Sequence, residues 1–175
     1  MHTDTLTIRT AMPDDAYRLA WFGATTFMAA YAGLVPDDAL FDYVAGAFST
    51  HSVSRVIAEA GTTIYVAESQ GDLAGYALVR SGLPPAFVPG SNPVELGRLY
   101  VDANRKRQGI GSRLMTAVSE DAAVAGFDAM WLTVWERNPT AIAAYCQWGF
   151  NQYGSRRFEF AGQVHTDVVM AKVLT

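Results

Sequence analysis

Cysteine and histidine are scarce in this sequence: one and three of 175 residues, respectively. The single cysteine, Cys146, has no intramolecular partner for a disulfide, so a reducing cytoplasm is the expected location. The histidines lack metal-ligand spacing, so no metal is expected. Residues 1–5 do not resemble the start of a signal peptide, and no apolar run approaches the ~20 residues of a membrane-spanning helix. No membrane partner is therefore expected.

Charged residues are also few, at 17% of the chain, and acids outnumber bases to give a net charge of -4. Because phosphate neutralisation needs clustered Lys and Arg in excess, nucleic acid is not an expected partner. A mildly acidic protein suits a cationic small-molecule substrate better. Half of the residues are apolar or aromatic, which is typical of a globular chain. Its length fits one domain, predicted over residues 1–175.

Apolar periodicity and turn residues predict α and β elements around one sheet. Strands are expected over residues 6–9, 62–68, 73–80, 94–101, 129–135, 158–160 and 168–174. Helices are expected over residues 13–31, 36–48 and 112–125, with a short one capped by Thr50 and another capped by Asn138 and ended by Gly149. The proline-rich segment 81–93 predicts an irregular loop whose conformation the sequence does not determine.

One loop between a predicted strand and a predicted helix concentrates cationic and glycine residues, namely Arg105, Lys106, Arg107, Gln108, Gly109, Ile110, Gly111 and Ser112. The free N–H groups of a helix's first turn can face an anion, and the two glycines let the backbone approach a phosphate. A solvated turn with basic residues is the alternative. No Gly-Lys-Ser/Thr follows, and Leu114 replaces the third glycine of a dinucleotide fingerprint, so neither an ATPase nor a dehydrogenase is indicated.

Together with Leu99, Tyr100 and Val101, this loop resembles the GNAT signature Gln/Arg-x-x-Gly-x-Gly/Ala, which binds the pyrophosphate of acetyl-CoA. Lys106 departs from the first signature position but keeps its charge. The segment from Asn138 through Ala141 and Tyr145 to Gly149-Phe150 resembles the family's Asn-x-x-Ala-x-x-x-Tyr-x-x-x-Gly-Phe. The resemblance implies an α/β (α+β) GNAT fold, with a mixed, mostly antiparallel central sheet and helices on both faces. It also implies an N-acetyltransferase that uses acetyl-CoA as cosubstrate.

A narrower resemblance, to the PaiA-type bacterial spermidine/spermine acetyltransferases, rests on residues 131–138, residues 47–49, and Gly162 with Thr166-Asp167. His165 stands where that subgroup commonly has Gln. The resemblance implies a polyamine as the amine acceptor. A protein N-terminal or lysine amine, or an aminoglycoside, is an alternative acceptor, and an acetyl-CoA-binding sensor without turnover is an alternative function. A homodimer is expected by analogy with the family.

The family match also assigns roles to individual residues. Cofactor contacts are expected from Leu99, Tyr100, Val101, Lys106, Arg107, Gln108, Gly109, Ile110, Gly111, Ser112, Asn138 and Tyr145. Tyr145 is the predicted general acid for the leaving thiolate, because a phenol is protonated at pH 7. Glu95, on the cofactor strand, is the predicted base acting through water, the alternative being a carboxylate paired with Arg98. Acceptor contacts are expected from Phe27, Tyr31, Glu95 and Trp135.

Overall fold

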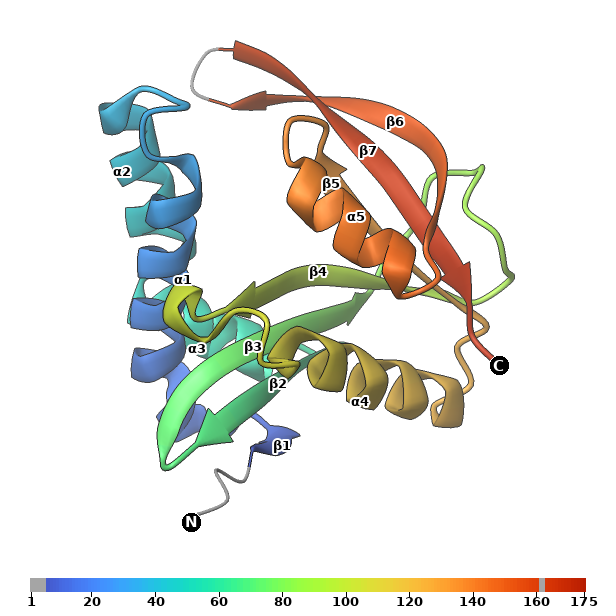
Figure 1. Cartoon of the computed structure of the whole chain (residues 1–175), viewed down its shortest axis with the longest axis horizontal. Helices are drawn as coiled ribbons and strands as arrows, with labels where there is room; N and C mark the ends of the chain where they lie inside the picture. Colours follow the sequence, from blue (N-terminus) through green and yellow to red (C-terminus); the bar gives the residue numbers. More distant parts are fainter. Residues whose placement is uncertain (1–5, 161–162) are drawn as a thin grey trace. The chain divides into compact units, whose positions relative to one another are not determined.

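A computed structural model describes residues 6–160 and 163–175. The described residues form a seven-stranded mixed sheet in the order β1-β2-β3-β4-β5-β7-β6, together with five α-helices (Figure 1). The strands are β1 Thr7–Thr10, β2 Thr62–Ser69, β3 Asp72–Ser81, β4 Pro93–Val101, β5 Ala129–Trp135, β6 Asn151–Phe160 and β7 Gln163–Val173. The helices are α1 Ala16–Tyr31, α2 Asp37–Ala47, α3 Thr50–Ala58, α4 Ile110–Val124 and α5 Pro139–Gln147. The expected mixed α/β architecture is confirmed.

The pairing of the strands is mostly antiparallel, as expected. β1 pairs with β2, and β7 with both β5 and β6, in antiparallel registers, whereas β4 and β5 run parallel. The chain divides into two compact units. The first contains the residues up to Leu78 together with Arg98–Leu114, and the second contains Val79–Gly97 and Met115–Thr175. The single domain expected over residues 1–175 stays a prediction.

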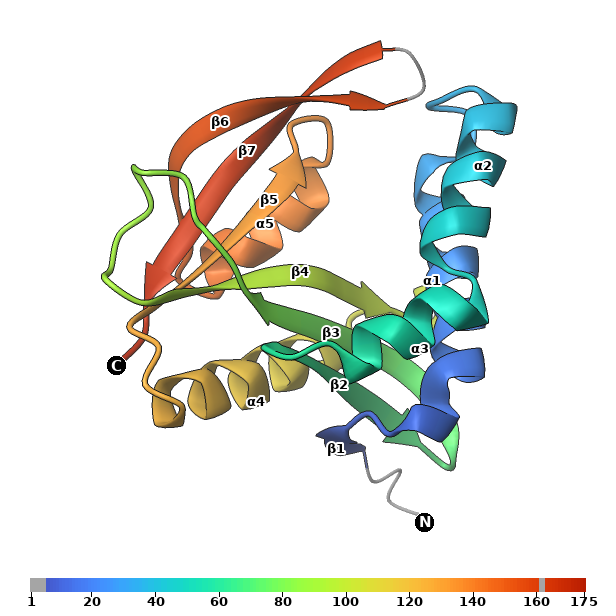
Figure 2. The same ribbon diagram turned by 180° about the vertical axis from the view of Figure 1, so that it is seen from behind.

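In the first unit, helices cover both faces of the strands. Adjacent residues of a strand point to opposite faces. A Cβ atom on Gly75 would lie 3.3 Å from side-chain atoms of Ile110 and Leu114 in α4. The next residue, Tyr76, belongs to the cluster that contains Leu19 of α1 and Val53 of α3. α4 therefore lies on one face, and α1 and α3 on the other; Figure 2 shows α3 in front of β2 and β3.

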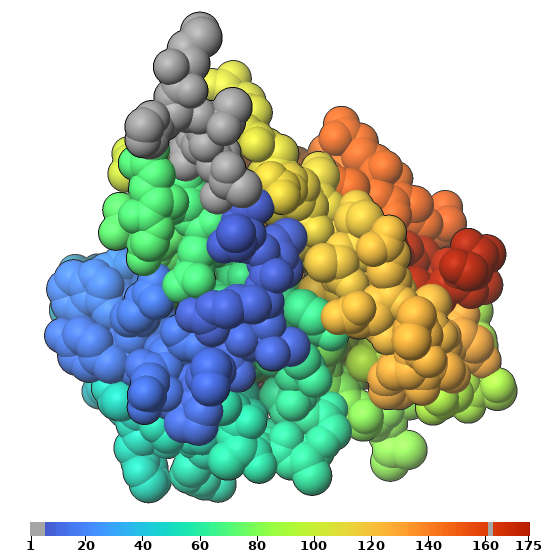
Figure 3. Space-filling model, turned by 90° about the horizontal axis from the view of Figure 1, so that it is seen from below, coloured from blue at the N-terminus to red at the C-terminus, as the bar shows by residue number. Residues whose placement is uncertain are grey.

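In the second unit, different elements pack against the two faces of β7. Lys172 Nζ donates a 2.8 Å hydrogen bond to Ser119 Oγ of α4. On the opposite face, Val169 and Ala171 form a buried cluster with Trp131 of β5 and Val88 of the loop 82–92. α5 lies in front of β5 and β7 in Figure 1, and the loop crosses in front of them in the reverse view of Figure 2. The outer flank of α4 is exposed to solvent (Figure 3).

The loop 82–92 is irregular, as expected, and the structure supplies the conformation that the sequence left open. The Asp128 carboxylate accepts hydrogen bonds from the Ser91 N–H at 2.6 Å, the Ser91 hydroxyl at 2.7 Å and the Asn92 N–H at 3.0 Å. These bonds hold the pKa of Asp128 below its ordinary value. The Phe87 ring lies so close to Gly154 of β6 that a Cβ there would come within 2.7 Å of it. The loop is thus anchored at both the turn before β5 and the edge strand.

Four boundaries differ clearly from the sequence-based expectations. β6 begins seven residues earlier than expected and β7 five residues earlier. The start of β6 is polar because β6 is the exposed edge strand of the sheet, where apolar side chains are not required. The cap of α3 is Ser49, whose side chain accepts from the Ser52 N–H, and not Thr50. α4 begins at Ile110, two residues before the expected Ser112.

Candidate active site

The loop that precedes α4 bends its backbone at two positions. Arg107 has φ 65° and Gly109 has φ 79°, the left-handed region that side chains other than glycine seldom adopt. The Arg113 N–H donates to the Gly109 carbonyl at 3.0 Å, so helical bonding starts there. The N–H groups of residues 110–112 therefore precede the helical ladder. Left-handed residues next to a helix start create concave backbone sites for anions.

The three cationic side chains of this loop differ in their partners. Arg105 lies 3.7 Å from the Asp102 carboxylate and 3.8 Å from that of Asp72. Lys106 and Arg107 are exposed, and neither forms an ion pair within residues 6–160 and 163–175. Two positive charges at the N-terminal end of α4 are thus available to an anionic ligand.

The predicted pantetheine-binding residues of β4 are half-buried: Leu99, Tyr100 and Val101. The parallel ladder to β5 pairs Pro93, Val94 and Glu95 of β4 with Ala129, Met130 and Trp131. The backbone of residues 99–101 lies outside that ladder. Among the described residues, the ladder to β5 includes only Pro93–Glu95 of β4, and the contact of residues 99–101 with pantetheine stays a prediction.

α5 is fixed at both ends by local hydrogen bonds. Asn138 Oδ1 accepts from the Ala141 N–H at 3.1 Å, which confirms the predicted N-terminal cap. At the other end Gly149 has φ 86°, and the Phe150 and Gly149 N–H groups donate to the carbonyls of Tyr145 and Cys146. This is a Schellman motif. The family's Asn and Gly-Phe positions thus have a local structural cause.

The same motif orients the predicted acid. The Tyr145 ring is half-buried and lies edge-to-face with Phe150, at 5.7 Å between ring centroids. Trp148 makes a second edge-to-face contact at 5.7 Å. A Schellman motif commonly includes such a contact between the residue after its glycine and the helix's last turn. The ring of Tyr145 is therefore positioned by its own helix end.

Glu95 is 8% exposed, and both carboxylate oxygens accept from the Arg80 guanidinium, at 2.7 and 3.1 Å. Arg98, the alternative partner suggested by the sequence, lies over the Phe48 ring at 4.5 Å instead. Protonation of Glu95 would remove the negative charge that pairs with Arg80. Its role as a base stays a prediction.

The predicted acceptor contacts occupy different surroundings. In the first unit, the Phe27 ring stacks on Tyr31 and on Tyr43, with centroid separations of 4.4 and 4.7 Å. Trp135 belongs to the second unit, is 8% exposed and contacts the His165 ring at 5.7 Å. The structure therefore brings Phe27 and Tyr31 together in an aromatic cluster. Their contact with an acceptor stays a prediction.

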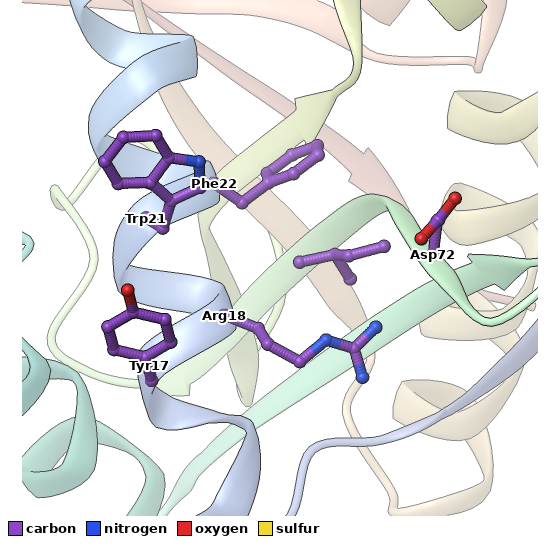
Figure 4. A pocket seen from close by; sticks show the side chains of 6 residues that line it. Tyr17, Arg18, Trp21, Phe22 and Asp72 are labelled. Atoms are coloured by element: carbon purple, nitrogen blue, oxygen red, sulfur yellow. The ribbon is translucent and has the colours of Figure 1, made fainter.

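Two side chains of usually buried residue types are exposed. Cys146 is exposed on α5. Trp21 of α1 is 68% exposed. It borders a cavity of about 390 Å³ (Figure 4) lined by Tyr17, Arg18, Trp21, Phe22, Asp72 and Leu73. This cavity contains none of the predicted site residues.

The described residues contain no group of three or more His, Cys, Asp and Glu side chains arranged to hold a metal ion. Within the same residues, no helix combines the length and apolar character needed to cross a membrane. The cytoplasmic location and the homodimer remain predictions from the sequence.

Asp167 of β7 is a residue that the sequence analysis did not assign to the site. It is 9% exposed, and the Thr133 hydroxyl donates a hydrogen bond to its carboxylate. The available signal was an acid directly before the apolar run Val168-Val169-Met170. Only the strand register shows that this acid faces inward, opposite Trp135 and Arg156.

Known proteins share both this sequence pattern and this fold. Residues 24–150 match the acetyltransferase (GNAT) family. A protein named as an uncharacterized N-acetyltransferase of Mycobacterium tuberculosis is 28% identical over 160 residues, covering 91% of this chain and 98% of that protein. The PaiA N-acetyltransferase of Thermoplasma acidophilum, solved in complex with coenzyme A, has a TM-score of 0.76 at 18% identity, covering 97% and 99% of the two chains.

A ribosomal-protein-alanine N-acetyltransferase from Brucella melitensis has a TM-score of 0.72 at 23% identity, covering 96% of this chain and 99% of that one. The fold, the loop before α4 and the capped helix α5 thus define an acyltransferase of the N-acetyltransferase class. The chain belongs to the GNAT family of acetyltransferases.

Proposed function

We propose that this protein transfers the acetyl group of acetyl-CoA to a primary amine of a small cationic acceptor. The observation that carries the proposal is the loop before α4. Its two left-handed residues, and the cations Lys106 and Arg107, which form no ion pair with a described residue, suit a diphosphate. The coenzyme A in the structure of the Thermoplasma relative supports the same cosubstrate.

The remaining cofactor contacts are those that the family resemblance implies. Residues 106–112 hold the diphosphate through their N–H groups and cations, the backbone of residues 99–101 binds the pantetheine arm, and Asn138 assists from the start of α5. The Tyr145 hydroxyl protonates the thiolate of CoA as it leaves. Acetyl-CoA supplies the activated acyl group.

Spermidine and spermine are the first acceptors to test. The similarity of residues 131–138 and Thr166-Asp167 to the PaiA type supports a polyamine, and the Thermoplasma relative supports the fold. Gly162, which belongs to the same resemblance, lies outside the described residues. The Brucella relative acts by name on a ribosomal-protein alanine, so a protein N-terminal amine is the second acceptor class.

A panel of amines distinguishes these acceptors. We expect release of CoA thiol with spermidine or spermine, and little with an N-terminal alanine peptide, a lysine peptide or an aminoglycoside. Turnover of a peptide or drug amine with inert polyamines would move the acceptor to another class. Binding of acetyl-CoA without thiol release from any amine would identify a non-catalytic sensor.

The phosphate role of the loop is tested by the double variant Lys106→Gln/Arg107→Gln. Its affinity for acetyl-CoA should fall by about tenfold or more, since a charge-assisted hydrogen bond contributes roughly 1.5–3 kcal/mol and about 1.4 kcal/mol is a tenfold change. Isothermal titration measures this affinity. Arg55→Gln/Arg157→Gln removes two exposed charges elsewhere and controls for net charge.

Acetyl-pantetheine is the matched ligand, because it lacks the diphosphate. Its binding should be equal in the parent and in the Lys106/Arg107 variant. If the variant bound acetyl-CoA as tightly as the parent, or lost both ligands equally, the diphosphate would not lie at this loop.

A further inference from the structure

Three carboxylates are buried in the described part of the chain: Asp15, Glu95 and Asp167. They differ in whether a cationic side chain pairs with them. Arg9 donates two hydrogen bonds to Asp15, at 2.7 and 2.9 Å, and Arg80 pairs with both oxygens of Glu95. Asp167 forms no ion pair with any described residue. A buried carboxylate without a paired cation is costly, and such groups concentrate at functional sites.

The surroundings of Asp167 come from three neighbouring strands. Trp135 of β5 and Arg156 of β6 lie directly opposite it in the two antiparallel ladders. The Thr133 hydroxyl, two residues before Trp135, donates a hydrogen bond to the carboxylate, and its oxygen accepts one from the Arg156 guanidinium at 3.5 Å. His165, two residues before Asp167, contacts the Trp135 ring. Because alternate residues share a face, a carboxylate and aromatic rings lie together on one side of the sheet.

Beside Asp167, the strand β5 is partly exposed at Thr133. Every other residue of β5 is buried, whereas Thr133 is half-buried. The loop 82–92 packs through Val88 on Trp131, Val169 and Ala171, which are nearer the other end of the strands. The loop therefore covers β5 before Thr133, at Trp131.

Asp167 is also tied to the start of α5. Its cross-strand partner Trp135 accepts a 2.9 Å hydrogen bond from the Asn138 N–H through its carbonyl oxygen. The Glu136 N–H donates to the Thr166 carbonyl at 3.1 Å. The turn from Trp135 to Asn138 thus connects the Asp167 carboxylate to the cap of the helix that carries Tyr145.

We propose that Asp167, rather than Glu95, binds the ammonium group of the acceptor and accepts its proton. An unpaired carboxylate beside aromatic rings is a suitable environment for an alkylammonium ion. This inference rests on the proposed acetyl transfer to an amine. Asp167 is then a catalytic residue, and Thr133 is a positioning residue.

The protons and bonds of the step balance. One N–H proton of the ammonium passes to Asp167, which leaves a lone pair on nitrogen. The nitrogen attacks the thioester carbonyl carbon, so an N–C bond forms and the C–S bond breaks when the tetrahedral intermediate collapses. The thiolate takes the Tyr145 proton, a second N–H proton restores Tyr145, and Asp167 releases its proton to water.

The environment of Asp167 also favours proton uptake. Burial raises the pKa of Asp167 above its ordinary value, against the Thr133 hydrogen bond and the charges of Arg156 and His165, which lower it. β5 and the loop 82–92 contribute no ionisable side chain, so Arg156 and His165 are the ionisable neighbours on the adjoining strands and loop. A base works best with a pKa close to the operating pH.

The test compares Asp167→Asn with the parent on two amines of different basicity. With spermidine, an ammonium ion at pH 7, kcat/KM should fall by about 100-fold or more, the usual contribution of a general base. With trifluoroethylamine, which is already unprotonated at neutral pH, the loss should shrink to less than about tenfold, because no proton must be removed before attack. A structural role would reduce both rates equally.

The pH profile gives a second readout. In the parent, kcat/KM should rise with pH as Asp167 ionises, and Asp167→Asn should lose this limb. Thr133→Val removes a hydrogen bond that lowers the pKa of Asp167, so the limb should move to higher pH, and Thr133→Ser should restore it. Retention of the limb in Asp167→Asn with its loss in Glu95→Gln would assign the base to Glu95 and overturn the proposal.

Folding is controlled independently. Because the pKa of Asp167 is raised in the folded protein, its ionisation destabilises the fold as pH rises through that value, so Asp167→Asn should melt no lower than the parent at pH 8. Acetyl-CoA affinity should be unchanged. Glu159→Gln, which neutralises an exposed carboxylate on β6, is the matched control and should keep the activity of the parent.

The remaining outcomes separate the two proposals. If the parent acetylates spermidine and Asp167→Asn stays within about threefold of it, the role of Asp167 is overturned and the acetyl transfer stands. Equal losses on both amines would also overturn it. If the parent binds acetyl-CoA but acetylates no amine of the panel, both proposals fail.

Discussion

Tyr145→Phe is expected to lower kcat by about 100-fold or more, because a positioned general acid contributes roughly 10²–10⁴-fold to a rate. The substitution removes only the hydroxyl. The ring contacts with Trp148 and Phe150 and the hydrogen bonds of the Schellman motif do not involve it, so α5 should keep its end geometry. Steady-state release of CoA thiol with the best amine of the panel measures the loss.

Two measurements keep this result specific to proton donation. The acetyl-CoA affinity of Tyr145→Phe should equal that of the parent. An acetyl thioester of an acidic thiol needs less protonation of its leaving group and should lose less activity. Unchanged kcat with acetyl-CoA would exclude Tyr145 as the acid.

The second large effect concerns stability, at Gly23 of α1. A Cβ on this buried glycine would lie 2.5 Å from Cδ1 of Phe48 and 2.8 Å from the Tyr76 hydroxyl oxygen. Both rings are nearly fully buried, and burial raises the pKa of Tyr76 to about 12, so its hydroxyl stays protonated. Gly23→Ala should lower the free energy of unfolding by about 1–3 kcal/mol, as overpacking of a core does.

Gly46→Ala is the matched control for this measurement. Gly46 lies in α2, and a Cβ there would meet nothing within 4 Å. The free energy of unfolding should rise by about 0.5–1 kcal/mol, since alanine is the better helix former. Urea unfolding of the two variants gives both numbers. Equal stabilisation by the two substitutions would show that Phe48 and Tyr76 do not pack against Gly23.

The elements that could be predicted from the sequence carry their cause in adjacent residues. β5 is found at the predicted residues 129–135 because a continuous apolar run is bounded by polar and turn residues. α5 has an Asn cap and a Gly-Phe end within its own sequence. The turn between β2 and β3 has left-handed Gln70 and Gly71, which suits a two-residue hairpin. Neighbouring residues alone determine these features.

The features that could not be predicted depend on strand pairing. The sequence does not show whether Arg80 or Arg98 pairs with Glu95. In the folded chain the partner is Arg80. The burial of Asp167 arises from the ladders on both sides of β7. Only the last three residues of the edge strand β6 were predicted, because its exposed residues need no apolar alternation. Local patterns therefore predicted β5, the ends of α5 and the β2–β3 turn better than the surroundings of the buried carboxylates.

The two capped ends of α5 have a consequence for how this enzyme can diversify. A helix of nine residues is too short to persist alone in water, so its stability depends on its ends and its packing. Its Asn138 cap and its Gly149 turn lie outside the strand positions that surround Asp167. Under the proposed role of Asp167, substitutions on those strands would change which amine is accepted without altering the hydrogen bonds that cap and end the helix of Tyr145.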